Sequence, residues 1–282
     1  MSEAPIEVGG TIRRIAIVTI RENSCASYLA RKLEGCGAEI AYVNQTQLKV
    51  ELRSRAYFAR LWRRRGAFTA IDNLLLYGAY LARKALRPSR AENAEGQGYP
   101  VMAPDPALRG ERWLRFVDVE DINAEAGRRA LADLAPDLVL LGGAPVLSRK
   151  TIAIARVACI NPHCGIVPRY AGGSPSDWAI YERRFEDVGY TIHLVDPVVD
   201  SGPILHQERV AWDPSLSNAH LWPLLAQAMY DRLAEIAKDL VAGRRLQAVP
   251  QPPARVLPPA GLIVRAIAER RRRAYARTRG AA

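Results

Sequence analysis

RIAIVTIRENSCASYLARKLEGCGAEIAYVN, residues 14–44, is the stretch that decides the fold. It opens with a short apolar run rich in β-branched residues (14–20), which predicts a strand. A helical pattern follows, and Gly35 or Gly37 can end it. Residues 38–44 predict a second strand. Because strand, helix and strand fit into about 30 residues, we expect a βαβ unit and a parallel sheet with helices on its faces.

The pattern continues downstream. Five further strands are predicted, at residues 113–119, 137–143, 155–161, 190–196 and 202–212. Asn123 is expected to cap a helix that runs to Leu134, and residues 219–242 form the last clear helix before a Pro-rich stretch. The sequence therefore predicts an open, mostly parallel α/β sheet.

Two segments do not fit a plain α/β pattern. Residues 51–87 predict a pair of basic amphipathic helices, and residues 88–112 predict a loop rich in Pro and Gly. After the helix 219–242 come a Pro-rich stretch, 249–261, and an arginine-rich helix. The expected organisation is a main domain at 11–212 with a helical insertion at 51–90, followed by a helical, Pro-rich and Arg-rich extension at 213–282.

The positive charge lies mainly in the helical insertion and in the arginine-rich helix near the C-terminal end. The 282 residues carry a net charge of +11, of which residues 49–90 contribute +9 and residues 265–279 contribute +6, leaving −4 for the rest. A basic chain suggests nucleic acid, but the body of this one is mildly acidic. The arginines either form solvated helix faces or, beside Phe58, Trp62, Phe68 and Leu74 to Leu76, make a surface for anionic lipid or a partner subunit.

Several classes of protein are disfavoured. No apolar run approaches the ~20 residues of a membrane span, and the N-terminus lacks the pattern of a secretory signal. Four irregularly spaced cysteines favour reduced thiols and a cytoplasmic location. Cys159 and Cys164 flank His163 without the paired spacing of metal ligands, so no metal is expected. Gly142-Gly143 lacks the pattern of a phosphate-binding loop.

One set of polar residues has chemical potential. Asn161 and His163 stand two apart at the end of a predicted strand, where open α/β sheets bind ligands, and Asp200 lies in a loop between two later strands. An amide, an imidazole and a carboxylate in one cleft are the groups that acyl transfer to an amine needs. Taken alone, an Asn and a His at a strand end are more often turn caps or core polar groups. His193 and Trp178 are interpreted as packing or supporting residues.

The surrounding residues sharpen this interpretation, because the run from Asp137 to Val210 resembles the 10-formyltetrahydrofolate-dependent formyltransferase family. The resemblance rests on five elements in the family's order and spacing: LLGGAPVL (140–147), NPH (161–163), PRYAG (168–172), GYTIH (189–193) and DSGP (200–203). It implies a Rossmann-like sheet that does not bind a dinucleotide, and 10-formyltetrahydrofolate as the formyl donor.

The resemblance also implies residue roles. The catalytic residues would be Asn161, His163 and Asp200. The folate pocket would be lined by Leu140, Gly142, Gly143, Val146, Leu147 and Val199, and the substrate side by Pro162, Cys164, Tyr170 and Gly172. Asn161 N–H and a protonated His163 would then stabilise the oxyanion formed when an amine attacks the formyl carbon, while Asp200 would accept the amine proton.

The family resemblance leaves the acceptor open. Familiar members have a serine where this chain has Gly165, and the resulting His-x-Gly-Ile-x-Pro form, with a helical insertion, resembles a subgroup that formylates small amines, including amino sugars. Formylation of methionyl-tRNA and hydrolysis of formyltetrahydrofolate are the alternatives, although each is usually accompanied by a further domain that the sequence pattern does not show. Glycinamide ribonucleotide is disfavoured because residues 21–24 lack a glycine-rich phosphate turn. A homodimer stays open.

Overall fold

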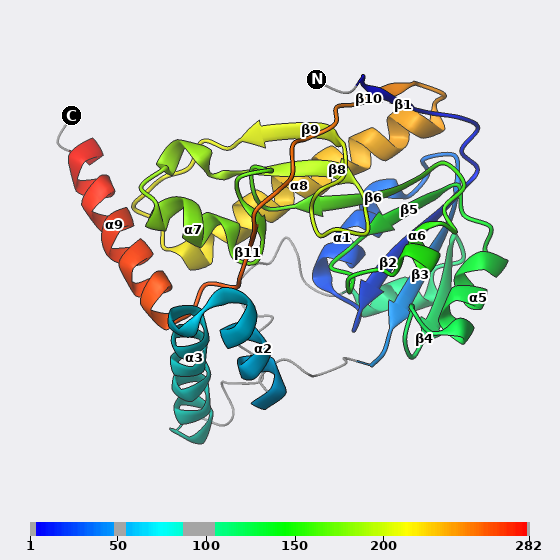
Figure 1. Ribbon diagram of the computed structural model, residues 1–282. Coiled ribbons are helices and arrows are strands. Elements are labelled where there is room, and N and C mark those ends of the chain that lie inside the picture. Colours follow the sequence, from blue (N-terminus) through cyan, green and yellow to red (C-terminus); the bar gives the residue numbers. More distant parts are fainter. Residues whose placement is uncertain (1–3, 48–54, 87–104, 281–282) are drawn as a thin grey trace.

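The computed structural model describes residues 4–47, 55–86 and 105–280 (Figure 1). Its centre is a seven-stranded sheet in the order β4-β3-β2-β5-β6-β8-β9, in which the first five strands pair in parallel and β8 pairs antiparallel with both β6 and β9. The strands are β2 (Arg14–Ile20), β3 (Glu39–Gln45), β4 (Leu114–Val119), β5 (Leu138–Leu141), β6 (Ala158–His163), β8 (Gly189–Leu194) and β9 (Ile204–Arg209). This confirms the open, mostly parallel α/β sheet.

The βαβ unit forms where the sequence predicts it. Helix α1 (Ser24–Leu33) begins at Asn23, whose side chain accepts a hydrogen bond from the Cys25 N–H at 2.8 Å. Strand β2 is buried on both faces, as expected for a central parallel strand. Its odd-numbered residues Ile15 and Ile17 face the core under α1, and its even-numbered residues face the other core.

Two helices complete the layers on the sheet faces. Helix α8 (Asn218–Val241) joins α1 on one face and buries Leu233 and Leu240 there, while α5 (Glu125–Asp133) buries Leu131 on the other. Full burial of such a side chain contributes about 1.5–3 kcal/mol. The predicted cap at Asn123 is wrong, because the N-cap position is Ala124. The Asn123 side chain instead binds the Val146 carbonyl at 2.9 Å and accepts from the Ser148 N–H at 2.7 Å.

The insertion is a helical hairpin, as predicted, made of α2 (Arg55–Arg65) and α3 (Ala67–Leu86). It lies beside the C-terminal part of the chain and extends away from the sheet (Figure 1). The buried Asp72 carboxylate accepts hydrogen bonds from the Ile263 and Val264 N–H groups at the start of α9 (Leu262–Gly280). Residues 51–54 and 87–90 of the predicted insertion, and most of the predicted 88–112 loop, lie outside the described residues.

The chain after Trp212 returns over the sheet before it reaches α9. Strand β10 (Leu246–Ala248) pairs with β1 (Ile6–Val8), and β11 (Val256–Leu257) pairs in parallel with β7 (Ala171–Gly172). The short elements that complete the fold are η2 (Pro106–Gly110), α6 (Arg149–Ile152), α7 (Pro175–Tyr181) and η3 (Phe185–Asp187). The division into 11–212 and 213–282 stays a prediction.

The arginine-rich helix is partly built into the fold. Arg272 is only 4% exposed and binds the Glu269 carboxylate and the Pro214 carbonyl. The Arg271 guanidinium lies 4.7 Å from the centre of the Tyr181 ring, a cation–π contact. These two arginines therefore pack against the body rather than forming a fully solvated face. None of the helices in the described part of the chain is both long and apolar enough to cross a membrane.

Candidate active site

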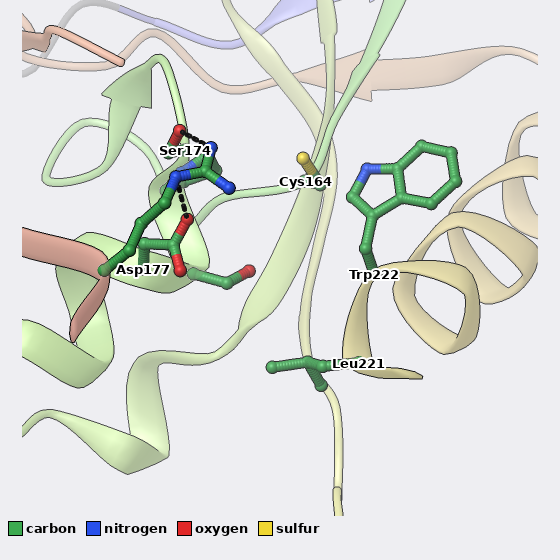
Figure 2. A pocket seen from close by; sticks show the side chains of 8 residues that line it. Cys164, Ser174, Asp177, Leu221 and Trp222 are labelled. Atoms are coloured by element: carbon green, nitrogen blue, oxygen red, sulfur yellow. Dashed lines mark hydrogen bonds and ion pairs between the residues drawn. The ribbon is translucent and has the colours of Figure 1, made fainter. Parts of the chain in front are cut away.

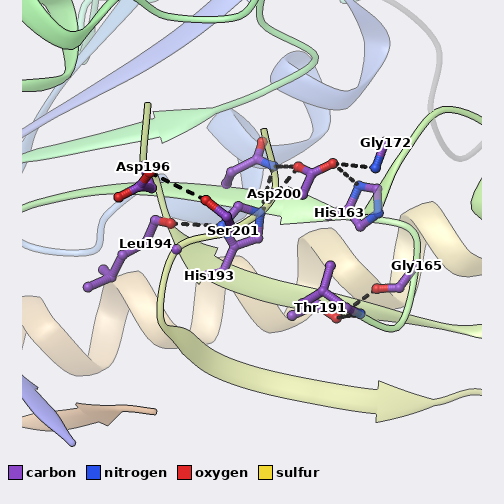
Figure 3. Close-up of polar contacts among 12 residues, drawn as sticks. His163, Gly165, Gly172, Thr191, His193, Leu194, Asp196, Asp200 and Ser201 are labelled. Atoms are coloured by element: carbon purple, nitrogen blue, oxygen red, sulfur yellow. Dashed lines mark hydrogen bonds and ion pairs between the residues drawn. The ribbon is translucent and has the colours of Figure 1, made fainter. Parts of the chain in front are cut away.

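The three residues assigned to catalysis lie together at the carboxyl end of the parallel strands. Asn161 and His163 share one face of β6, because side chains two apart on a strand point the same way. The Asp200 carboxylate lies between them: one oxygen is 3.3 Å from His163 Nδ1, and the other accepts from Asn161 Nδ2 at 3.3 Å (Figure 3).

Asp200 is held in an unusual backbone conformation. Its φ is +53°, a left-handed value that is uncommon for a residue other than glycine. The Gly172 N–H donates to its carboxylate at 2.8 Å. Although burial raises the pKa of Asp200, the hydrogen bonds and charges of His193, His163 and Gly172 outweigh it, and the net pKa lies below the ordinary value. The carboxylate is therefore ionised at neutral pH.

His193 supports this arrangement from the neighbouring strand. In the antiparallel pair of β6 and β8 it stands opposite Asn161, so both side chains reach the same face. Its Nδ1 lies 2.8 Å from the Leu194 carbonyl, which can only accept, so Nδ1 carries a proton. Its Nε2 lies 3.1 Å from Asn161 Nδ2 and 3.4 Å from the Asp200 carboxylate, so His193 contacts both residues.

His163 is engaged at both ring nitrogens. Nε2 donates to the Tyr170 carbonyl at 2.7 Å, and Nδ1 faces Asp200. A bare nitrogen lone pair against a carboxylate would be repulsive, so this geometry favours a proton on Nδ1. Burial is the largest influence on His163, and its pKa lies below the ordinary value although the Asp200 charge and the Tyr170 carbonyl oppose that effect. A proton on Nδ1 therefore relies on the charge of Asp200.

Close contacts around position 165 explain why a glycine stands there. A Cβ atom there would lie 2.4 Å from the Tyr170 carbonyl oxygen and 2.7 Å from His163 Nε2. These are the two atoms that form the hydrogen bond holding the imidazole. Serine, which familiar family members carry at this position, cannot fit in this backbone arrangement without displacing that bond.

A cavity of about 250 Å³ lies against Asn161, His163 and Asp200. Of the residues expected to line a folate pocket, Val146, Leu147 and Val199 line it. Pro162, expected on the substrate side, lines it too. Leu141, Ala144 and Pro145, from the quoted segment 140–147, and Asp196 also line it, and Val195 is the lining residue that the sequence analysis did not foresee.

The other three residues expected at the folate pocket lie elsewhere. Leu140 pairs in register with Ile160 and points with it into the core, so its neighbour Leu141 takes the cavity face. Gly142 packs against Ala26 of α1, and Gly143, with φ +72°, packs against Asn23. Both glycines shape the turn after β5. The period-2 alternation of strands could have distinguished Leu141 from Leu140, but only once the register with β6 was known.

The other three residues expected on the substrate side lie at different places. The Tyr170 ring is buried and its hydroxyl donates to Glu182 at 3.0 Å, so only its carbonyl reaches the site. Gly172 contributes its N–H to Asp200. Cys164 lines a second cavity of about 450 Å³ (Figure 2). Its other lining residues are Ser174, Pro175, Ser176, Asp177, Leu221, Trp222 and Arg265.

The chemistry around Cys164 is that of a neutral thiol. Burial raises its pKa to about 11, so it is not a thiolate at neutral pH. In the same cavity, Arg265 Nε lies 3.8 Å from the Asp177 carboxylate. Across the described ranges, no group of three or more His, Cys, Asp or Glu side chains is arranged to hold a metal ion.

The Pro-rich segment holds the loops of the site, a role that the sequence analysis did not foresee. Gln251 Nε2 donates to the Asp200 carbonyl at 3.1 Å and to the Gly202 carbonyl at 2.6 Å. Farther along, the Gly173 N–H donates to Leu257 at 3.0 Å, next to the β7 residue that binds Asp200. A Cβ on Gly172 would lie 2.3 Å from the Leu257 oxygen, so this close pairing needs glycine. Proline-rich composition resembles a linker and carries no local signal for such contacts.

Comparison with known proteins finds formyltransferases. Residues 117–237 match the formyl transferase family model, a range that contains Asn161, His163 and Asp200 but stops before Gln251. The chain is 33% identical over 142 residues to the methionyl-tRNA formyltransferase of Idiomarina loihiensis, covering 50% of this chain and 44% of that protein. It is 28% identical over 166 residues to the one of Myxococcus xanthus, covering 58% and 53%. The chain thus spans about half the length of these curated relatives.

Solved structures agree in fold. A sugar N-formyltransferase from Shewanella sp FDAARGOS_354 superposes with a TM-score of 0.54 at 15% identity, covering 92% of this chain and 87% of that one. A 4-N formyltransferase from Francisella tularensis gives 0.52 at 16% identity, covering 93% and 88%. At such identities the likeness concerns the fold. The match over residues 117–237 and the curated relatives support the formyltransferase family for this part of the chain.

Proposed function

We propose that this chain is an N-formyltransferase that moves the formyl group of 10-formyltetrahydrofolate to a primary amine of a small molecule, an amino sugar or a related biosynthetic intermediate. The observation that carries the proposal is the convergence of Asn161, His163 and Asp200 beside a cavity. We also propose a cytoplasmic location, which the four free cysteines support.

The cavity beside Asn161 suits the donor. Val146 and Val199 are 69% and 37% exposed at its rim, so apolar surface is available to cover a flat ring system. Bound there, the donor supplies an activated formyl carbon. Asn161, His163 and Asp200 then lie on the wall of the same cavity, where the amine must approach.

The residues would act as follows. As the amine nitrogen bonds to the formyl carbon, the carbonyl oxygen becomes an oxyanion and the amine nitrogen must lose a proton. Asp200, ionised and buried, accepts that proton, directly or through a water. The carbonyl then re-forms as the bond from that carbon to the tetrahydrofolate nitrogen breaks, and the leaving nitrogen takes up the proton that the amine lost.

For His163 to donate to the oxyanion, it must release Asp200 or the Tyr170 carbonyl. For Asn161 Nδ2 to donate to the oxyanion it must release His193 or Asp200. Losing one such donor typically costs about 3–4 kcal/mol in the barrier.

The cavity at Cys164 suits a small polar acceptor. Ser174, Ser176 and Asp177 offer hydrogen-bonding groups, Arg265 offers a cation, and Trp222 offers a ring face. Its volume of about 450 Å³ lies within the usual range for small-molecule sites, ~300–1,000 Å³. This combination favours a hydroxylated molecule. Methionyl-tRNA is the second candidate acceptor, because the curated relatives carry that name.

One assay separates the candidates. The purified chain is incubated with 10-formyltetrahydrofolate alone, with nucleotide-linked amino sugars, or with methionyl-tRNA; tetrahydrofolate release and formylated product are measured. The proposal expects release only with an amino sugar and a mass gain of one formyl group on it. Release without an acceptor would identify a hydrolase, and formylation of methionyl-tRNA alone would replace the small-molecule acceptor.

A further inference from the structure

The hairpin α2–α3 carries an unusual amount of exposed apolar surface. Trp62, Phe68 and Leu74 are 54%, 53% and 51% exposed, and Ile71 and Leu75 are exposed as well. Phe58, Trp62, Ile71 and Leu74 line a groove of about 510 Å³ between the two helices. Scattered exposed apolar residues are normal, but a contiguous set on one element marks an interaction surface.

This apolar face is not the one that joins the hairpin to the body. The anchoring residues of α3 are Asp72 and Asn73, which are buried: Asp72 binds the start of α9, and Asn73 Nδ2 donates to the Pro259 carbonyl at 3.1 Å. Ile71, Leu74 and Leu75 flank these two in sequence and stay exposed. The hairpin extends away from the sheet (Figure 1), and its apolar side chains are exposed.

The charge of the hairpin is of one sign. Residues 55–86 contain seven basic residues and one acid, a net charge of +6. That acid is Asp72, which is buried against α9. Arg63, Arg64 and Arg65 at the end of α2 are all exposed. The outward surface therefore combines cations with aromatic and aliphatic side chains and has no exposed acidic side chain within the described hairpin residues.

Charge and apolar character together select the occupant. A second copy of the hairpin would bring two surfaces of +6 together, which is repulsive. A nucleic acid would pair with the arginines but would leave the aliphatic side chains of Ile71, Leu74 and Leu75 without an apolar partner. An anionic bilayer takes both, because its headgroups attract cations and its acyl boundary accepts apolar side chains.

We propose that the α2–α3 hairpin docks this chain on an anionic membrane surface, with Trp62, Phe68 and Leu74 at the boundary of headgroups and acyl chains and the α2 arginines among the headgroups. The helices lie on the bilayer rather than crossing it. The proposal does not depend on the formyl transfer reaction, since it rests on the hairpin alone.

The test is flotation of the full chain with vesicles of phosphatidylcholine, with and without 30% phosphatidylglycerol as the probe. We expect binding only to the anionic vesicles, weakened by 0.5 M salt. Phe68→Ser with Leu74→Ser should lower the partition coefficient at least about tenfold, because each exposed ring or branched chain contributes that much when buried. Arg63→Glu with Arg64→Glu should abolish binding.

Matched controls lie elsewhere on the surface. Leu216→Ser removes an exposed apolar side chain, and Arg129→Glu with Arg149→Glu reverses two exposed arginines. These should bind vesicles like the parent, and circular dichroism checks that every variant is folded. Absence of flotation, or flotation that the hairpin variants do not change, overturns the proposal. A dimer in sedimentation or a tRNA complex that is lost in Phe68→Ser with Leu74→Ser, without vesicle binding, assigns the surface to those partners instead.

Discussion

The side-chain amide of Gln251 donates to the backbone carbonyl of Asp200 at 3.1 Å, across 51 positions of sequence. The same nitrogen donates to the Gly202 carbonyl at 2.6 Å. Asp200 has a left-handed backbone, which costs a non-glycine residue roughly 1–3 kcal/mol and persists only when its surroundings hold it. A segment outside the matched family range thus holds the backbone of the proposed proton acceptor.

Gln251→Ala tests whether that contact matters for turnover. It removes two partly buried hydrogen bonds, each worth about 0.5–1.5 kcal/mol, so we expect a small loss of stability but a loss of kcat of roughly 10-fold or more as the Asp200 loop relaxes. Steady-state formyl transfer and urea unfolding provide the two readouts. Gln247→Ala, at an exposed position of the preceding strand, is the control. Equal turnover in the two variants would contradict a positioning role for Gln251.

Gly165→Ser installs the residue of familiar family members. Its Cβ would meet the Tyr170 carbonyl and His163 Nε2, so the imidazole must move. We expect a destabilisation of about 1–3 kcal/mol and a fall in kcat of roughly 100-fold or more. Gly110→Ser is the control, because a Cβ there has no neighbour within 4 Å. A crystal structure of Gly165→Ser with His163 unmoved would refute this explanation of the glycine.

Asn161→Ala and His163→Ala test the proposed chemistry directly. Each should reduce turnover by orders of magnitude, since a donor to a developing oxyanion is worth about 3–4 kcal/mol. Cofactor binding, measured by fluorescence with tetrahydrofolate, should change far less than kcat. Trp178→Phe, which loses a hydrogen bond to Pro258 outside the cluster, serves as the comparison. Full turnover in either alanine variant would remove that residue from the mechanism.

Glu269 makes a pH-dependent contribution to the stability of α9. Hydrogen bonds from Arg272 and then Arg273 lower its pKa from 4.5 to about 2. A lowered folded-state pKa means that the stabilisation is complete above pH 4.5 and is lost as pH falls toward 2. We expect the difference in unfolding free energy between the parent and Glu269→Gln to shrink from pH 5 to pH 3.

Urea titrations at pH 7, 5, 4 and 3 measure that difference. Glu235→Gln, in an exposed pair with Arg232, is the control and should change stability little at any pH because solvent screens such pairs. A difference for Glu269→Gln that stays constant down to pH 3 would show that Arg272 does not depend on this carboxylate.

Local pattern was enough to place most of the regular structure. The β2 run, the α1 pattern and the glycines after it predict the βαβ unit because side-chain periodicity is a local property. The same rule puts Asn161 and His163 on one face of β6. The prediction of Asn123 as a helix cap was wrong, because its side chain donates a hydrogen bond to the Val146 carbonyl instead.

The sequence by itself was enough to predict the α/β sheet, the helical insertion and the three residues of the candidate site. Periodicity and motif spacing are properties of the order of residues and need no knowledge of tertiary contacts. Tertiary structure alone decided that Leu141 rather than Leu140 faces the cavity, because register belongs to a pair of strands. It alone decided that Tyr170 contributes only its carbonyl and that Gln251 holds Asp200. These contacts join segments far apart in sequence, and the type of a residue does not specify which distant residue it will contact.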